Sequence, residues 1–290
     1  MLSGQVPMTR DDTPRSPLSP FAVPPLAVEG LAVGHDGRRV LERADFQIEA
    51  GRFTVLLGPN GSGKSTLLAA MARLLPPMAG SVLLDGADIA RLPTRAVSRK
   101  LGLLPQQPLV PEGLSVFDLV SRGRFPHQGL FRQWSAADEA AVGRAMAVTG
   151  VADLAARGVD SLSGGQRQRV WIAMVLAQET PVILLDEPTT FLDMRHQIDI
   201  LAMLATLVRD HGRTIVCVLH DLNLALQHAD RFLFLKGGGI RHRLDHPAAC
   251  TAAIVGDVFD MPVAGLSHPE TGLPVFVPIS APTSMPVACR

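Results

Sequence analysis

The chain has few cysteines, and their placement excludes two common classes of site. Three cysteines occur in 290 residues, at Cys217, Cys250 and Cys289. An odd number at such wide spacing gives neither a disulfide framework nor the close pairs that bind zinc, and it is typical of a reducing compartment. Cys217 lies within an apolar run, residues 214–219, so we interpret it as a small buried side chain of a strand.

Long apolar runs and a net charge are also absent. No apolar stretch reaches the ~18 to 20 residues that a membrane-spanning helix needs. Residues 1–25 are rich in proline, serine and charge and lack the apolar core of a signal peptide, so we interpret them as a disordered leader. The formal net charge is zero, which gives no general attraction to DNA or anionic lipid. We therefore expect no nucleic-acid partner, and any membrane role would pass through other proteins.

The chain does contain short apolar runs that alternate with helical segments. Residues 53–57, 182–185 and 214–219 are continuous apolar runs, which are typical of strands buried on both faces. Between residues 106 and 161 the sequence becomes helical and rich in loops, which indicates an inserted helical subdomain. The alternation predicts an α/β fold with a mostly parallel sheet.

A glycine-rich loop follows the first buried run and fits the pattern G-x-x-x-x-G-K-[ST]. Its glycines let backbone N–H groups point toward phosphates, and the loop opens onto a helix N-terminus, which favours negative charge. Lys64 would reach the β and γ phosphates, and the Ser65 hydroxyl would bind Mg²⁺. The predicted phosphate loop comprises Gly58, Pro59, Asn60, Gly61, Ser62, Gly63, Lys64, Ser65 and Thr66.

Two carboxylates, Asp186 and Glu187, end the run of residues 182–185. Ligands bind at the carboxyl ends of strands in open α/β sheets, so we expect both acids to lie beside the phosphates. Asp186 would hold Mg²⁺, and Glu187 would act as a general base toward water. A strand that simply ends in two solvated acids is the alternative if the phosphate loop is left out of account.

A second candidate anion site lies far along the chain, at the start of a predicted helix. Ser163, Gly164, Gly165 and Gln166 follow Leu162, and backbone amides at a helix N-terminus attract phosphate. One nucleotide needs only one such terminus, so a second one makes sense if it serves another nucleotide. An ordinary N-cap serine followed by flexible glycines is the alternative.

The Leu-Ser-Gly-Gly-Gln run, together with the phosphate loop and the two carboxylates, resembles the signature of ATP-binding cassette (ABC) proteins. The resemblance implies a RecA-like P-loop NTPase core, an N-terminal antiparallel β subdomain and the inserted helical subdomain. It implies ATP and Mg²⁺ as cofactors and a second copy of the chain as partner. Ser163 and Gly165 would then contact the γ-phosphate bound by the opposite copy, and Asp193 matches the loop that crosses the interface.

Three single residues take their roles from this resemblance alone. Gln106 matches the glutamine that touches Mg²⁺ or the attacking water, although the adjacent Gln107 fits the same place. His220 matches the histidine that contacts the γ-phosphate. His35 occupies the position where the family usually stacks an aromatic ring on adenine, and Val40 is the alternative support for the base.

Local sequence narrows the resemblance further. Residues 104–108, 122–126 and 191–193 are similar to the ATPases of importers for ferric siderophores, ferric citrate, haem and cobalamin. This implies membrane-spanning permease subunits as partners, a substrate-binding protein as an indirect partner, and a peripheral location at the cytoplasmic face of the inner membrane. The cassette would comprise residues 26–244, with a tail at 245–290. The ATPase of an exporter and a non-transport ABC ATPase are the alternatives.

Three histidines near the end of the chain have the spacing of a metal site. His242 and His246 are four residues apart, and His268 follows. Because this region lacks a clear helical pattern, we favour the interpretation that they are solvated residues of the tail.

Overall fold

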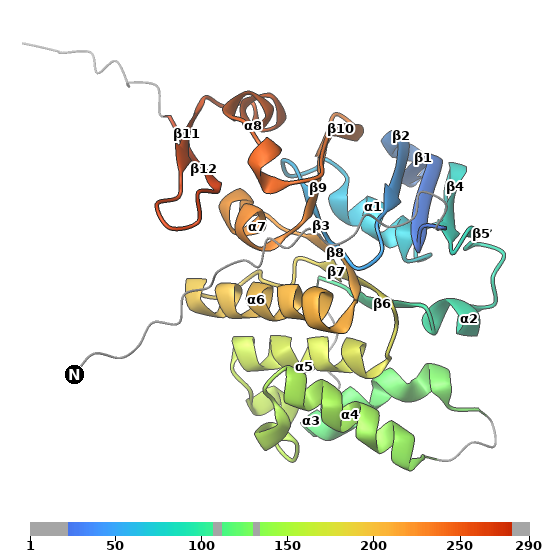
Figure 1. The fold of residues 1–290 in the computed structure, drawn as a ribbon. Helices are drawn as coiled ribbons and strands as arrows, with labels where there is room; N and C mark the ends of the chain where they lie inside the picture. Colours follow the sequence, from blue (N-terminus) through green and yellow to red (C-terminus); the bar gives the residue numbers. More distant parts are fainter. Residues whose placement is uncertain (1–22, 107–111, 130–133, 280–290) are drawn as a thin grey trace, which may run out of the picture.

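The computed structural model describes residues 23–106, 112–129 and 134–279 (Figure 1). The expected leader lies almost entirely outside these residues. Within them, ten strands form one sheet, in the order β5-β4-β1-β2-β10-β9-β3-β8-β7-β6. The strands are β1 (Leu26–His35), β2 (Arg38–Ile48), β3 (Phe53–Leu57), β4 (Ala79–Leu84), β5 (Ala87–Asp88), β6 (Leu101–Leu104), β7 (Val182–Asp186), β8 (Thr214–Val218), β9 (Arg231–Lys236) and β10 (Gly239–Leu244).

One half of the sheet is parallel, as the apolar runs predict. Strands β9, β3, β8, β7 and β6 pair with one another in parallel register. All five residues of β3 are buried, because Phe53, Val55 and Leu57 enter the core on one face while Leu56 enters the core on the other. Cys217 of β8 is likewise fully buried, and burial raises the pKa of its thiol.

The other half of the sheet is antiparallel and is built from the first strands of the chain. β1 pairs with both β2 and β4, and β4 pairs with β5, all in antiparallel register. β10 connects the two halves, because it pairs with β9 on one side and, through Gly239 and Arg43, with β2 on the other. The predicted N-terminal antiparallel subdomain is therefore part of the same continuous sheet.

Helices cover both faces of the sheet. Leu67 and Met71 of α1 belong to one core, and Ile200 and Leu204 of α6 belong to the other, so these two helices lie on opposite faces. The helices are α1 (Lys64–Met71), α2 (Thr94–Ser98), α3 (Val116–Ser121), α4 (Ala136–Val148), α5 (Gly164–Ala177), α6 (Met194–His211), α7 (Leu222–His228) and α8 (Ala252–Phe259), with short 3-10 helices η1 (Arg122–His127), η2 (Ala152–Leu154), η3 (Val159–Ser161) and η4 (Pro247–Ala249).

The expected helical insertion is present and packs against α5. Helices α3, η1 and α4 contact α5 and lie below the sheet in Figure 1. Arg124 connects η1 to α4 and to the segment after α5. Its Nε donates to Asp138 Oδ1 at 3.0 Å in a buried ion pair, and its Nη1 donates to Glu179 Oε2 at 2.7 Å. Ser135 and Asp138 also form a capping box that fixes the start of α4.

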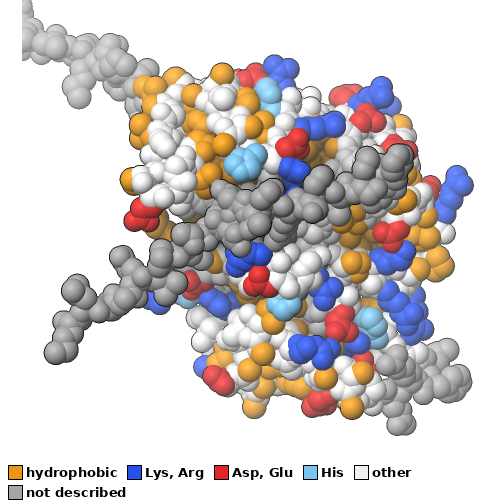
Figure 2. All heavy atoms as spheres, in the orientation of Figure 1, with side chains coloured by type: hydrophobic (Ala, Val, Ile, Leu, Met, Phe, Trp, Pro, Cys, Tyr) orange, Lys and Arg blue, Asp and Glu red, His pale blue; other side chains and the backbone are white. Residues whose placement is uncertain are grey.

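The C-terminal part is more ordered than the sequence pattern indicates. Residues 247–278 form η4, α8 and a hairpin of β11 (Val263–Ser267) and β12 (Pro274–Pro278), which we call the C-terminal hairpin. These elements are short and separated by proline and glycine, so their apolar periodicity is weak. Figure 2 shows hydrophobic side chains gathered over this part of the surface, where Leu266 and Val277 are exposed. No described helix is both long enough and apolar enough to span a bilayer.

Candidate functional site

The phosphate loop joins β3 to α1 in the conformation that its glycines allow. Gly58, Gly61 and Gly63 have φ values of 149°, 77° and 95°, which side chains rarely tolerate. A Cβ on Gly58 would lie 2.2 Å from the carbonyl oxygen of Leu235 in β9. Glycine is therefore required where the loop passes this neighbouring strand. The hydroxyl of Ser62 is buried and has no hydrogen-bond partner among the described residues, which fits a loop shaped to receive an oxygen-rich ligand.

Lys64 is buried at the start of α1 and points back into the loop. Its Nζ donates to the carbonyl oxygens of Gly58 and Pro59, both at 2.9 Å. Burial lowers the pKa of the Lys64 ammonium, and the carboxylates of Asp186 and Glu187 partly oppose this effect. The ammonium that the phosphates would meet is therefore also influenced by the two carboxylates at the end of β7.

Asp186 and Ser65 supply the oxygen atoms of a candidate Mg²⁺ site. The Ser65 hydroxyl donates to Asp186 Oδ1 at 3.0 Å, which connects the first turn of α1 to the end of β7. Burial raises the pKa of the Asp186 carboxyl, while the hydrogen bond from Ser65 acts in the opposite direction. Mg²⁺ prefers a carboxylate and hydroxyl or water oxygens, so this pair fits the cation.

Glu187 lies at the centre of a polar cluster. His220 Nε2 lies 2.6 Å from Glu187 Oε1, while Gln106 Nε2 donates to Oε2 at 2.7 Å and Thr190 Oγ1 donates to the same oxygen at 3.0 Å. Burial alone would raise the pKa of the Glu187 carboxyl, but these donors together bring it below its ordinary value. The side chain is therefore an ionised acceptor near neutral pH. Gln107, the alternative to Gln106, lies outside the described residues.

Thr190 was not among the residues predicted for the site. It reaches Glu187 because the chain turns sharply after β7, where Glu187 has a φ of 51°. The only signal in the sequence was its position three residues after Glu187, and hydroxyl residues at that spacing are common in turns. The contact became visible only in the folded chain.

His35 and Val40 both lie beside the phosphate loop. His35 Nε2 is 3.4 Å from Thr66 Oγ1, and a Cβ on Gly63 would lie 3.1 Å from a methyl group of Val40. The β1–β2 turn thus overhangs the first turn of α1, where a base attached to the phosphates would lie. Both candidates for the base-stacking residue therefore lie near the phosphate loop, and the choice between them stays a prediction.

The signature residues start α5 and lie against the first turn of α6. Ser163 caps α5 in a capping box with Gln166, and a Cβ on Gly165 would lie only 2.6 Å from Cδ2 of His196. His196 is fixed in turn by Asp193, whose Oδ1 lies 2.7 Å from its Nδ1 and also accepts from its backbone N–H. His196 is a second residue that sequence reasoning missed.

The structure does not bring all the predicted residues into one site. Helix α1 packs on β1, β2, β7 and β8, whereas α5 packs on α3, α4, η1 and β6 (Figure 1). Lys64, Ser65, Asp186 and Glu187 therefore share one site with His220 and Gln106, and Ser163 to Gln166 lie on a different part of the molecule.

The three C-terminal histidines lie in separate local networks. His242 Nε2 lies 2.8 Å from Asp257 Oδ2, the ring of His246 accepts from the N–H of Ala248, and the ring of His268 accepts from the N–H of Glu270. The part of the chain that the structure describes has no group of three or more potential ligands arranged for a metal ion.

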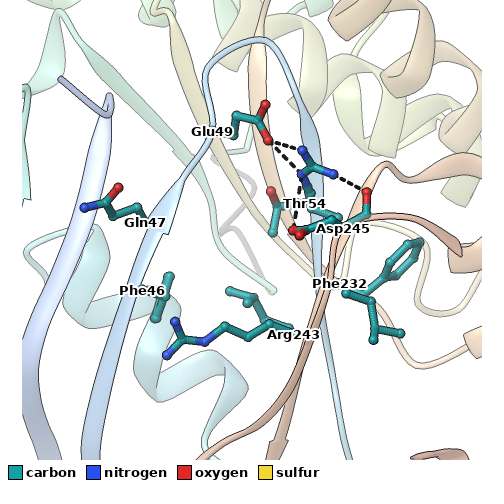
Figure 3. A pocket seen from close by; sticks show the side chains of 10 residues that line it. Phe46, Gln47, Glu49, Thr54, Phe232, Arg243 and Asp245 are labelled. Atoms are coloured by element: carbon teal, nitrogen blue, oxygen red, sulfur yellow. Dashed lines mark hydrogen bonds and ion pairs between the residues drawn. The ribbon is translucent and has the colours of Figure 1, made fainter. Parts of the chain in front are cut away.

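A pocket of about 220 Å³ lies at the opposite end of β3 from the phosphate loop (Figure 3). Its two arginines are hydrogen-bonded within the protein. Arg231 binds Glu49, with Nε 2.7 Å from Oε2, and Arg243 donates to the backbone carbonyl of Asp45. Both arginines that line this pocket therefore have partners among the residues described.

The chain is similar in sequence and fold to known proteins of one family. Residues 41–190 match the ABC transporter family. A relative from Bacillus subtilis (strain 168), the probable siderophore transport system ATP-binding protein YusV, is 49% identical over 253 residues, which is 87% of this chain and 92% of the relative. The solved structure of a putative metal-chelate type ABC transporter in an inward-facing conformation has a TM-score of 0.76 and 29% identity, and the match covers 88% of this chain and 97% of that chain. A bacterial ABC transporter cassette solved as a dimer has a TM-score of 0.67 and 28% identity, over 76% and 98% of the two chains.

Proposed function

This chain belongs to the ABC transporter family as an ATP-binding, ATP-hydrolysing subunit, and we propose that two copies of it power the import of an iron chelate through a membrane permease. The observation that carries the proposal is the cluster around Glu187. It places a carboxylate that can accept a proton beside the carboxylate and hydroxyl of the Mg²⁺ site, at the end of a phosphate loop. The relative from Bacillus subtilis, named for siderophore transport, supports the cargo class.

Each part of the site has a role in holding ATP. The amides of residues 58–66 would surround the phosphates, and Lys64 would exchange its two loop carbonyls for phosphate oxygens. Ser65 and Asp186 would hold Mg²⁺, which neutralises charge on the phosphates when bound. His35 or Val40 would support the adenine ring.

Glu187 would act as the general base for hydrolysis. Because its pKa is lowered, the carboxylate is ionised near neutral pH and can accept a proton from water. Gln106 and His220 hold its two oxygens and would orient the water and contact the γ-phosphate. Lys64 would stabilise the negative charge that develops on the transferred group.

The second copy would complete each nucleotide site. Ser163, Gly164, Gly165 and Gln166 cannot serve the phosphate loop of their own chain from their position on α5, so a second chain is the natural source of the ligand. The solved dimer of a similar cassette supports this arrangement. Asp193, which fixes His196 against Gly165, would lie at the same interface.

The transport partners are inferred from the helical subdomain and from a solved transporter of similar fold. The helical subdomain, with residues 106–161, would dock on permease subunits, and closure of the ATP-bound pair would move it. The chain would then be peripheral at the cytoplasmic face of the inner membrane, and a substrate-binding protein would deliver the cargo from the other side. The solved metal-chelate transporter supports this assembly.

A transport assay with a matched inactive variant tests the proposal. We expect the chain to copurify with a permease encoded beside it, and the complex in proteoliposomes to take up radioactive iron as a siderophore chelate when MgATP is present. Glu187→Gln should lower hydrolysis by a factor of about 10² or more and abolish uptake, while ATP binding is kept. Uptake of cobalamin instead of iron would show that the proposed cargo is wrong. Normal hydrolysis by Glu187→Gln would show that Glu187 is not the general base.

A further inference from the structure

We propose that Asn223 is a positioning residue for hydrolysis, which uses the C-terminal hairpin as a support to hold His220 against Glu187. The inference rests on the proposed role of His220. It assigns a function to Asn223 and to the C-terminal hairpin, which follows all the nucleotide motifs in the sequence.

The side-chain amide of Asn223 makes two hydrogen bonds to one residue of the hairpin. Asn223 Nδ2 donates to the carbonyl oxygen of Phe276 at 3.1 Å, and the N–H of Phe276 donates to Asn223 Oδ1 at 2.9 Å. The N–H and C=O of one residue point to the same side of a strand, and β12 has β11 on its other side, with Gly265 opposite Phe276. The side-chain amide therefore makes the two hydrogen bonds to Phe276 that a neighbouring strand would otherwise make. This needs a donor and an acceptor on the same group, which an amide side chain provides.

The hairpin is a firm support for this contact. The Phe276 ring is buried in the main core, in the same cluster as Val255 and Val258 of α8. It also covers Gly265, where a Cβ would lie 3.4 Å from the ring. The position of the Phe276 backbone is thus set by core packing as well as by pairing with β11. An amide that binds it is fixed relative to the core.

Asn223 is close in sequence to His220, and a short helix connects them to the core. Asp221 caps α7 by accepting from the N–H of Leu224 at 2.8 Å, and His220 directly precedes it. Helix α7 has seven residues, too few to be stable without tertiary contacts. Its position therefore depends on what it packs against, and β12 is one of those elements (Figure 1).

His220 needs this external support because burial does not fix it. Its side chain is 46% exposed, while that of Glu187 is 10% exposed. Its imidazole is held by the contact with Glu187 and by its own backbone, and the backbone after His220 is the start of α7. Loss of the Asn223 contact would free that start and let the 2.6 Å contact between His220 and Glu187 lengthen. The consequence is a slower chemical step with unchanged binding of ATP.

A double-mutant cycle in the full-length chain tests this mechanism. Asn223→Ala removes both hydrogen bonds, and Asn223→Asp keeps the acceptor but loses the donor. We expect each to lower kcat for ATP hydrolysis by about tenfold with little change in KM. Gln227→Ala, on the same helix, is the matched control and should keep normal kcat. When His220 is already alanine, adding Asn223→Ala should lower kcat no further, because the residue acts through His220.

Phe276→Leu separates positioning from stability. It shortens the core side chain but keeps the pairing of β12 with β11 and the two backbone groups that Asn223 binds, so it should lower Tm while kcat at a permissive temperature stays normal. Two outcomes would overturn this inference and leave the proposed function intact. One is normal kcat in both Asn223 variants, and the other is an equal loss of kcat from Asn223→Ala in the presence and in the absence of His220. Normal kcat in His220→Ala would overturn both this inference and the proposed role of His220, while the role of Glu187 would still stand on its own variant.

Discussion

The imidazole Nε2 of His220 lies 2.6 Å from the carboxylate Oε1 of Glu187. The two residues follow neighbouring parallel strands, β8 and β7, which pair from Val182 and Thr214 onward. Because parallel strands end at the same edge of a sheet, side chains placed just after them meet there. This contact joins the proposed general base to the proposed γ-phosphate sensor.

Removal of the Ser65 hydroxyl should weaken Mg²⁺ binding selectively. Ser65→Ala deletes the oxygen that lies 3.0 Å from Asp186 Oδ1. We expect the free Mg²⁺ needed for half-maximal hydrolysis to rise by about tenfold, while binding of ATP in EDTA changes little. Hydrolysis rates over a range of free Mg²⁺ measure the first quantity, and titration with a fluorescent ATP analogue in EDTA measures the second. Ser98→Ala, on the exposed helix α2, is the control, and an unchanged Mg²⁺ requirement in Ser65→Ala would exclude this residue as a ligand.

Loss of the Thr190 hydroxyl should move the acid limb of the pH profile. The hydrogen bond from Thr190 helps to keep the pKa of Glu187 below its ordinary value. A general base works in its deprotonated form, so kcat falls as pH falls through this pKa. Thr190→Val should raise the pKa and shift the fall of kcat to higher pH. Thr189→Val is the neighbouring control, and a superimposable profile for Thr190→Val would show that its hydroxyl does not tune the base.

A methyl group at Gly165 should block the signature but leave the phosphate loop intact. The added Cβ would lie 2.6 Å from His196 Cδ2, and Asp193 holds that ring in place. We expect Gly165→Ala to lower hydrolysis by about tenfold or more, with ATP binding by the single chain unchanged. His196→Ala in the same chain should restore part of the activity, because it provides the missing space. Failure of this rescue would mean that the glycine is needed for another reason.

The buried pair of Arg124 and Asp138 should stabilise the helical subdomain. Arg124→Leu leaves two carboxylates, Asp138 and Glu179, without their buried partner, so we expect a loss of about 3 to 5 kcal/mol in the free energy of unfolding. Arg144→Leu is the matched control, since it contacts the same Glu179 from an exposed position and should cost about 0 to 1 kcal/mol. Urea denaturation at pH 7 measures both, and equal losses would contradict the buried pair as the cause.

This stabilisation should also depend on pH in a defined direction. The hydrogen bond from Ser135 and then that from Arg124 lower the pKa of Asp138 against the opposing effect of burial. A lowered carboxyl pKa gives stability that is complete above the ordinary aspartate value of about 4 and is lost as pH falls through the folded value. The penalty of Arg124→Leu should therefore shrink in acid. A penalty that is constant from pH 7 to below pH 3 would show that the effect comes from packing alone.

Much of the fold could be predicted because it depends on local pattern. The runs at 53–57 and 182–185 have continuous apolar character, and each became a buried parallel strand with side chains in both cores. The phosphate loop was equally accessible, since glycine spacing and a following helix are enough to define it. The C-terminal hairpin was not, because two strands of five residues between prolines and glycines give little periodic signal.

The sequence by itself determined which residue types stand at strand ends and helix starts. Those positions were enough to predict a nucleotide ligand, the two carboxylates beside it and the signature. The tertiary structure decided which of them meet. Gln106 and Glu187 are 81 residues apart in the chain and Asn223 and Phe276 are 53 apart, yet each pair is joined by hydrogen bonds. Periodicity reports that a side chain is buried or at an edge, but its partner depends on strand order and helix packing, which only the folded chain fixes.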